Sequence, residues 1–163
     1  MQKDKFAKIA KEIGIKNELV QTDEAIAMHD DNQALAYAQP TAKFAGLLFY
    51  TNQSKGTAEE VKKLIDKKSA LKWADRFLEQ FELLPRKIKD DRIKLNIETL
   101  CDQTEAVVFD GKERSKKKIK TEIRSQITLN EIPVDGPRSK IRMIFKDQEK
   151  PITMHLGLWD NIE

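Results

Sequence analysis

The residues with the clearest chemical potential form a run of lysines in the second half of the chain. The segment KERSKKKIK, residues 112–120, holds five lysines and one arginine. Residues 112–124 together carry seven Lys or Arg against two Glu, a formal charge of +5. A clustered cationic segment binds phosphates through charge, with an affinity that falls steeply with salt. This run therefore predicts contact with nucleic-acid phosphates or with an acidic protein surface.

Neighbouring strands are expected to widen this site. If residues 119–129 and 141–146 form adjacent strands, their outward cations line up as one basic stripe. The candidate nucleic-acid-binding residues are Lys112, Arg114, Lys116, Lys117, Lys118, Lys120, Arg124, Lys140 and Arg142. Aromatic side chains for base stacking are missing from this set, because Phe109 and Phe145 are expected in the core. A lysine-rich surface loop without a ligand is the competing interpretation.

An acidic segment lies in the first half of the chain. Residues 17–42 contain five acids and no Lys or Arg. The acids are Glu18, Asp23, Glu24, Asp30 and Asp31. Opposite charges on one protein favour docking with a second copy or with a complementary subunit. The alternative function is therefore a protein–protein assembly or scaffold component that uses residues 17–42 and 112–124, and self-association is possible.

A third interpretation is a magnesium-dependent nuclease. In that chemistry carboxylates hold Mg²⁺ and a lysine assists the attacking water. Asp110 followed by Glu122-Ile123-Arg124 has this outline. Arginine stands in the place of the lysine, however, and it does not give up its proton in proteins. The sequence therefore favours a non-enzymatic binding protein over an enzyme.

Other catalytic and cofactor sites lack their essential residues. The chain has two histidines, His29 and His155, and one cysteine, Cys101. Such a set makes no plausible metal cluster and no internal disulfide. None of the six glycines forms a phosphate-binding loop. We therefore expect no cofactor and no metal, and we expect Cys101 to be a small buried side chain.

The composition is typical of a folded, soluble protein. The 163 residues carry 30 Lys+Arg and 27 Asp+Glu, and a chain of this length buries about two-thirds of its unfolded surface. The sequence contains no run of 18 apolar residues, so it predicts no membrane-spanning helix. The first residues lack the apolar core of a secretory signal, and a single cysteine suits a reducing compartment. A cytoplasmic location is the resulting expectation.

The elements that must position these residues change their hydrophobic period near Pro85. Before it, apolar residues recur at helical spacing. Residues 3–13 predict a short helix that Gly14 closes, and the alanine-rich residues 17–39 predict further helices. Residues 41–51 fit a buried helix or a buried strand, with the helix weakly favoured.

The strongest helical pattern covers residues 57–83. Thr57 and Glu60 have the spacing of a capping box. An apolar stripe then runs from Val61 to Phe81, over about seven turns of helix, and Pro85 ends it.

After Pro85 apolar residues alternate every second position, which predicts β-strands. Five strands are expected, near residues 93–97, 106–109, 119–129, 141–146 and 152–158. Asp110-Gly111 is a turn dipeptide between the second and third strands. A helix is the competing interpretation for residues 113–130, because three isoleucines also recur there at every fourth position.

The predicted fold class is α+β. A helical subdomain at residues 1–85 is followed by an antiparallel β-meander of about five strands at residues 92–163. The polar residues 85–92 are the expected hinge. The two parts are expected to pack as one compact unit.

Overall fold

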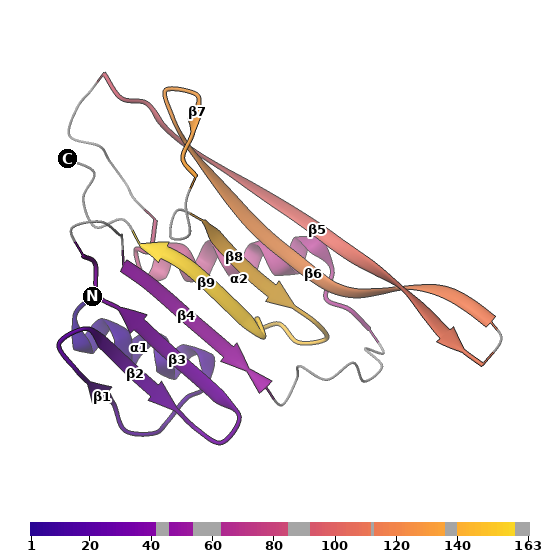
Figure 1. The fold of residues 1–163 in the computed structure, drawn as a ribbon, viewed down its shortest axis with the longest axis horizontal. Coiled ribbons are helices and arrows are strands. Elements are labelled where there is room, and N and C mark those ends of the chain that lie inside the picture. The colour runs from indigo at the N-terminus through magenta and orange to yellow at the C-terminus, as the bar shows by residue number, and fades with distance from the viewer. Residues whose placement is uncertain (42–45, 54–62, 85–91, 112, 136–139, 159–163) are drawn as a thin grey trace.

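The protein folds as one antiparallel sheet with two helices against one of its faces (Figure 1). The computed structural model describes residues 1–41, 46–53, 63–84, 92–111, 113–135 and 140–158. Its helices are α1 (Lys3–Ile13) and α2 (Lys67–Gln80). Its strands are β1 (Val20–Gln21), β2 (Ala25–His29), β3 (Gln33–Ala38), β4 (Gly46–Asn52), β5 (Leu95–Asp110), β6 (Glu113–Leu129), β7 (Ile132–Pro133), β8 (Ile141–Phe145) and β9 (Thr153–Leu158).

The strand order joins the two halves of the chain. The order is β1-β2-β3-β4-β9-β8-β6-β5, and β7 pairs with β6 off this path. At the middle, β4 and β9 form six antiparallel residue pairs, from Gly46–Leu158 to Thr51–Thr153. A single sheet therefore contains strands from before and after residues 85–92.

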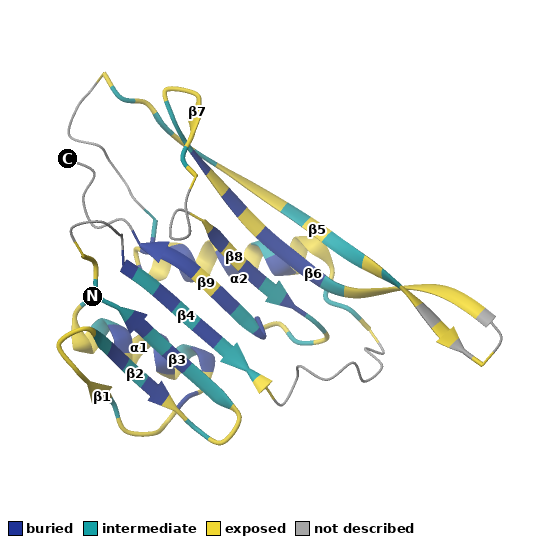
Figure 2. Cartoon of the chain, in the orientation of Figure 1, coloured by how far each residue is buried: buried dark blue, intermediate teal, exposed yellow. Residues whose placement is uncertain are grey.

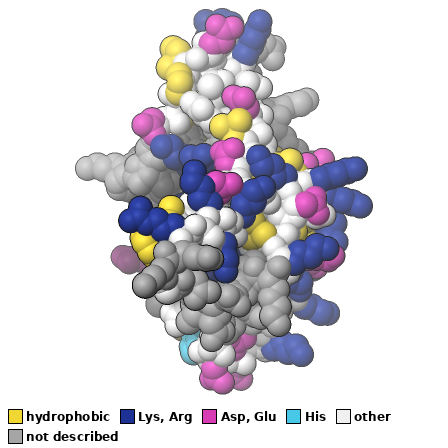
Figure 3. Space-filling model, turned by 90° about the vertical axis from the view of Figure 1, so that its right-hand side faces the viewer, with side chains coloured by type: hydrophobic (Ala, Val, Ile, Leu, Met, Phe, Trp, Pro, Cys, Tyr) yellow, Lys and Arg dark blue, Asp and Glu magenta, His cyan; other side chains and the backbone are white. Residues whose placement is uncertain are grey.

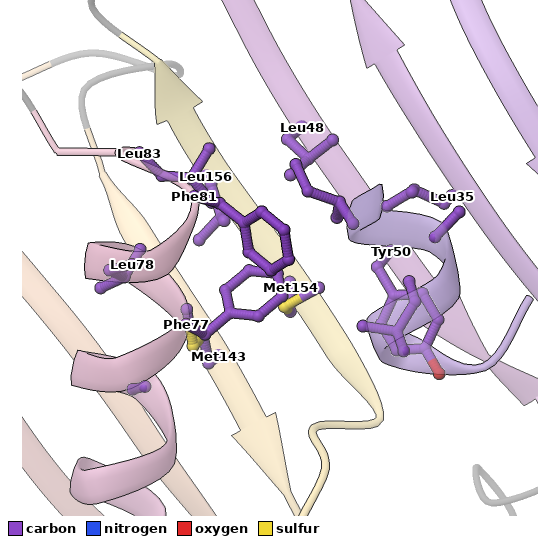
Figure 4. Packing of buried hydrophobic residues seen from close by; sticks show 14 of the residues in the cluster. Leu35, Leu48, Tyr50, Phe77, Leu78, Phe81, Leu83, Met143, Met154 and Leu156 are labelled. Carbon is purple, nitrogen blue, oxygen red and sulfur yellow. The ribbon is translucent and has the colours of Figure 1, made fainter. Parts of the chain in front are cut away.

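The hydrophobic core fills the space between the sheet and the two helices. In Figure 4, Phe77 of α2 and Phe81, the residue directly after α2, lie over Met154 and Leu156 of β9, while Leu48 faces the region of α1. Buried and more exposed residues alternate along the central strands (Figure 2). The inward residues form one cluster that includes side chains from both helices. The opposite sheet face has no described helix on it, and we call it the open face.

The short helix predicted at residues 3–13 is confirmed as α1. Its apolar positions Phe6, Ile9, Ala10 and Ile13 are all buried. Gly14 has φ of 101°, and its N–H donates to the carbonyls of Ala10 and Lys11. A residue with a side chain is strained in this left-handed conformation, which explains why glycine stands at the end of the helix.

The helices predicted for residues 17–39 are wrong, because this stretch forms β1, β2 and β3. Alanine suggested helix, but here it alternates with large residues that face the core. In β2 and β3, Ile26, Leu35 and Tyr37 are almost fully buried while the alanines between them lie on the open face. Asp30 closes the β2–β3 turn by accepting from the N–H of Gln33 at 2.8 Å. Tertiary burial thus outweighs the intrinsic helix preference of alanine.

The weak preference for helix at residues 41–51 is also wrong, since Gly46–Asn52 is β4. Leu48 and Tyr50 point to the core, and Leu47 and Phe49 lie on the other face at two-residue spacing. Leu47 and Phe49 are half-buried on the open face, and Phe49 contacts the His155 ring of the neighbouring strand, so apolar residues occur on both faces of β4. This is why period alone did not separate strand from helix.

The long helix predicted at residues 57–83 is shorter in the structure. The helix begins only at Lys67, where Asp66 caps it by accepting from the Ser69 N–H at 2.9 Å. Just before it, Ile65 bonds to distant residues: its N–H donates to the Lys146 carbonyl at 2.8 Å, and its own carbonyl accepts from the Thr121 hydroxyl at 2.8 Å. These tertiary bonds replace helical ones. The predicted capping box at residues 57–60 and the stop at Pro85 lie outside the described residues.

The antiparallel sheet predicted for the second half is confirmed, with different strand boundaries. The strands expected near residues 93–97 and 106–109 belong to one 16-residue strand, β5. Residues 113–130 are almost entirely strand β6, so the helical alternative is wrong. Polar residues between the two apolar runs suggested a break, but β5 lies at the edge of the sheet, where such residues meet solvent.

We expect the core under α2 to be sensitive to the loss of Phe77. Its side chain is 1 % exposed and its ring lies 4.7 Å from that of Trp73. Phe77→Ala should lower the free energy of unfolding by about 3–5 kcal/mol, measured by urea denaturation, because the change removes buried apolar surface and leaves a cavity. Lys72→Ala, an exposed change on the same helix, should cost less than about 0.5 kcal/mol. Equal effects of the two changes would contradict this placement.

Candidate nucleic-acid interface on the β5–β6 hairpin

A long two-stranded hairpin carries most of the predicted cationic residues. β5 and β6 pair from Leu95–Leu129 to Asp110–Glu113, and Gly111, with φ of 61°, lies in the turn. β8 pairs with β6 only between Thr121 and Ser125. From Glu113 to Lys120, before this contact begins, β6 has β5 as its only partner among the described strands. We call residues 105–118 the arm; Figure 1 shows it extending past β8 and α2, over about 20 Å at roughly 3.3 Å per residue.

A β-bulge marks the base of the arm. Thr104 pairs with Lys120, but Glu105 pairs with Lys118, so Ile119 is an extra residue on β6. A bulge of this kind bends the strand and increases its twist. It also places Lys118 and Lys120 on opposite faces of the ribbon, because their partners Thr104 and Glu105 are successive residues of β5. The single stripe of cations expected from alternation is therefore divided here.

One face of the arm combines cations with exposed apolar side chains. Val107 lies opposite Lys116, and Phe109 lies opposite Arg114. Val107 is 52 % and Phe109 is 65 % exposed. The Arg114 guanidinium carbon lies 5.2 Å from the centre of the Phe109 ring, within the range of a cation–π contact. Lys118 continues this face towards the base.

The expectation that Phe109 belongs to the core is therefore wrong, whereas Phe145 is fully buried as expected. The difference comes from the layers of the fold. Phe145 faces the helices, with its ring 5.8 Å from that of Trp73. The arm is a two-stranded ribbon that extends past α2 (Figure 1), so no described helix covers Phe109. The sequence signal was present in the apolar run before Asp110-Gly111, directly beside the lysines.

The remaining predicted cations on the sheet gather around one carboxylate. Glu122 accepts from Lys120 at 2.8 Å and from Arg142 at 2.8 and 3.3 Å. Arg124 lies 3.8 Å from Glu122 and donates to Asp102 at 2.9 Å. Three cations thus share two acids on the open face, and the group keeps a formal charge of +1.

Glu122 remains ionised because of these neighbours. Burial alone raises its pKa, but the hydrogen bonds and charges of Arg142 and Lys120 outweigh burial and lower the pKa to about 2. The carboxylate side chain is only 11 % exposed, whereas those of Arg142 and Arg124 are 45 % and 56 % exposed. The acid therefore acts as an anchor that holds guanidinium groups at the surface.

The predicted cations fall into two groups in the structure. Arg114, Lys116 and Lys118 lie on one face of the arm, and Lys117 lies opposite Ala106 on its other face. Lys120, Arg124 and Arg142 converge on Glu122, while Lys140 pairs with Asp135 at 2.9 Å. Lys112 lies outside the described residues. Figure 3 shows the end of the molecule from which the arm projects, where Lys and Arg side chains are interspersed with acidic and hydrophobic ones.

The hairpin register keeps apart Asp110 and Glu122, the two acids of the nuclease pattern. Glu122 lies opposite Asp102, eight residues before Asp110 in β5, which separates the two backbone positions by about 25 Å along the strand. Ligands of one Mg²⁺ lie about 2.1 Å from the ion. Among the described residues no group of three or more His, Cys, Asp or Glu is placed to hold a metal.

The single cysteine and the acidic segment take unremarkable positions. Cys101 is half-buried rather than fully buried; its thiol lies 3.8 Å from the Lys67 carbonyl, and burial raises its pKa. A raised pKa disfavours the reactive thiolate. Asp23 and Glu24 lie in the β1–β2 turn, and Asp30 and Asp31 lie in the β2–β3 turn. The acidic residues are thus divided between the two ends of β2.

Comparison of the chain with protein-family models, with curated proteins and with solved structures gave no match. No helix in the described residues is long and apolar enough to cross a membrane. The functional argument therefore depends on the geometry of this chain alone.

We expect the Glu122 cluster to make stability depend on pH. A carboxylate whose pKa falls from 4.5 to about 2 on folding stabilises the fold fully above pH 4.5 and loses that effect as the pH drops towards 2. Glu122→Gln should cost about 1–2 kcal/mol at pH 7, measured by urea denaturation. The difference from the unmodified protein should shrink between pH 4.5 and 2.5.

Glu98→Gln is the matched control, because Glu98 is an exposed acid on the edge strand β5. This variant should change stability by less than about 0.5 kcal/mol. A Glu122→Gln effect that stays constant from pH 7 to 2.5 would show that the cluster is not held by the charge of this carboxylate.

Proposed function

We propose that the protein is a non-enzymatic binding protein that contacts nucleic acid through the arm. The observation that carries this proposal is the shared face of the projecting ribbon, where Arg114, Lys116 and Lys118 lie beside the exposed Val107 and Phe109. Charge and apolar surface are thus presented together, away from the body of the protein. A surface that served solubility alone would not need the apolar pair.

The charges supply the first part of the interaction. Each Lys or Arg that contacts a phosphate releases counterions from the nucleic acid, which drives binding at low salt. The arm is also of suitable shape, because a two-stranded β-ribbon fits into the major groove of a duplex. Its length of about 20 Å leaves room for several phosphate contacts.

The apolar residues supply the second part. An aromatic ring at the end of a ribbon can stack on a base or wedge between base steps. Arg114 over the ring of Phe109 adds a guanidinium plane to this surface. Without a ligand, a two-stranded ribbon with exposed Val107 and Phe109 gains little stability from these side chains. Their position is better explained by a partner.

The alternative is an assembly component that joins acidic and basic regions of different molecules. β1 and β5 are at opposite ends of the strand order, so the acidic turns around β2 and the basic arm lie far apart on one chain. This arrangement suits head-to-tail contacts between copies. The division of the acids between two turns weakens the charge on either one, and we rank this alternative second. The magnesium-dependent nuclease ranks last, because the hairpin register places Asp110 and Glu122 about 25 Å apart.

Reversing the charges on the arm should weaken nucleic-acid binding. The variant carries Arg114→Glu, Lys116→Glu and Lys118→Glu. Its affinity for a 20-base-pair duplex and for a 20-nucleotide single strand should fall more than about tenfold at roughly 50 mM salt, with a shallower salt dependence. Fluorescence anisotropy with labelled oligonucleotides at several salt concentrations measures both quantities.

The matched control reverses three exposed lysines outside the arm, Lys8, Lys16 and Lys72, and so changes the net charge equally. This control should bind within about threefold of the unmodified protein, because nonspecific charge acts at longer range and is screened by salt. Equal losses in both variants would remove the arm as the binding site. If neither ligand binds but the arm variant alone loses self-association in sedimentation, the assembly alternative replaces the proposal.

Removing the exposed ring should act differently from removing charge. Phe109→Ala is expected to reduce affinity about fivefold or more, since stacking on a base contributes about 1–3 kcal/mol. The slope of log affinity against log salt should stay the same, because no cation is lost. Phe109→Trp should retain binding, and an alanine variant that binds normally would limit the arm to phosphate contacts.

A further inference from the structure

A second group of side chains on the open face has the chemistry to bind bases and phosphates. Four central strands contribute one residue each to a row across the sheet: Arg124 on β6, Arg142 on β8, His155 on β9 and Phe49 on β4. The register pairs Arg124 with Arg142, Arg142 with His155, and His155 with Phe49. Directly opposed residues of neighbouring strands share a face, so all four side chains lie on the open face.

Two of the four are rings in contact. Phe49 and His155 have ring centres 4.8 Å apart and an interplanar angle of 65°. His155 is exposed and Phe49 is half-buried. Desolvation by the neighbouring groups lowers the pKa of His155, and the positive charge of Arg142 lowers it further. Both effects favour the neutral imidazole, whose ring is suited to stacking.

The flank of Phe49 away from His155 is lined by small residues. Phe49 pairs with Ala36 of β3, and Ala36 pairs with Ala27 of β2. An alanine methyl group is too short to cover a phenyl ring on the next strand. Part of the ring therefore remains available to a planar ligand such as a base.

The two arginines are held at the surface before any ligand arrives. Glu122 accepts from Arg142, and Asp102 accepts from Arg124 at 2.9 Å. Their side chains remain 45 % and 56 % exposed. Side chains that are already ordered lose less entropy when a ligand binds. With Lys120 in the same group, the cations exceed the acids, which favours an anion along this end of the row.

We propose that the open face binds a short segment of single-stranded nucleic acid, with bases on Phe49 and His155 and phosphates near Arg124 and Arg142. The row spans three strand spacings, about 14 Å, which suits two or three nucleotides. Bases in a duplex are stacked on one another and cannot reach the rings, so the site selects single strands. This inference rests on the proposed function only in taking nucleic acid as the ligand. None of the four residues of the row belongs to the arm.

The test compares a 15-nucleotide oligo(dT) with a 15-base-pair duplex, using fluorescence anisotropy at about 100 mM salt. Phe49→Leu keeps the apolar bulk but removes the ring. It should weaken binding of oligo(dT) about fivefold or more and leave the duplex affinity unchanged. Phe49→Tyr should restore the affinity, which a merely structural role of the side chain does not require. Thr51→Val, on the same strand and face, is the control and should bind like the unmodified protein.

Each result separates this site from the arm. If the arm variant loses affinity for both ligands but Phe49→Leu binds oligo(dT) normally, the open-face site is refuted and the arm stands. If Phe49→Leu loses oligo(dT) affinity while the arm variant is unaffected, the open face stands without the arm. Loss of self-association in Phe49→Leu, with no change in oligo(dT) binding, would make this face a protein interface and overturn the inference. Thermal unfolding of each variant identifies any loss caused by misfolding.

Discussion

The pairing of β4 with β9 is the contact on which the rest of the structure depends. It joins a strand from the first third of the chain to the last strand, through six residue pairs. Because of it, α1 and α2 lie against the same sheet and their buried side chains belong to one cluster. Without this pairing each helix would cover a small sheet of its own, and small cores bury too little surface to be stable. The same pairing brings Phe49 and His155 together on the open face.

Placing both helices on one face determines the chemistry of the other. A sheet with one covered face shows water its outward residues, and these must be polar, small or paired. β2 and β3 meet this requirement with alanines, and β6 and β8 meet it with the charges around Glu122. In that cluster an almost buried carboxylate is stable because Lys120 and Arg142 donate to it. The same bonds restrain the cations that a phosphate would meet.

The arm follows a different rule, because it leaves the layered part of the fold. Before Thr121, β6 has no neighbouring strand except β5 among the described residues, so the arm lies outside the part of the described fold in which helices cover the sheet. Near the base of the hairpin, apolar side chains such as Ile123 are buried against the core. In the arm, the apolar side chains of Val107 and Phe109 are exposed to solvent. The bulge at Ile119 separates the two environments. Cations of similar sequence position therefore differ in role: Lys120 belongs to an ion cluster, and Lys116 and Lys118 lie beside the exposed apolar pair.

The sequence by itself determined the local features of this protein. The helix at residues 3–13, the turn at Asp110-Gly111 and the alternation of Ile123 and Ile127 follow from spacing and from residues with special backbone freedom. Such features depend on neighbours a few positions away, and the α+β class and the concentration of positive charge are visible in the same way.

Only the tertiary structure decided the remainder. Alanine-rich residues 25–38 form strands because Ile26 and Tyr37 are buried in the core on the side of the helices. Helix α2 begins later than the sequence predicts because Ile65 bonds to distant residues. The exposure of Phe109 and the pairing of Arg142 with Glu122 depend on which segments lie beside each other. Those neighbours are brought together by pairing between remote strands, which local spacing does not encode.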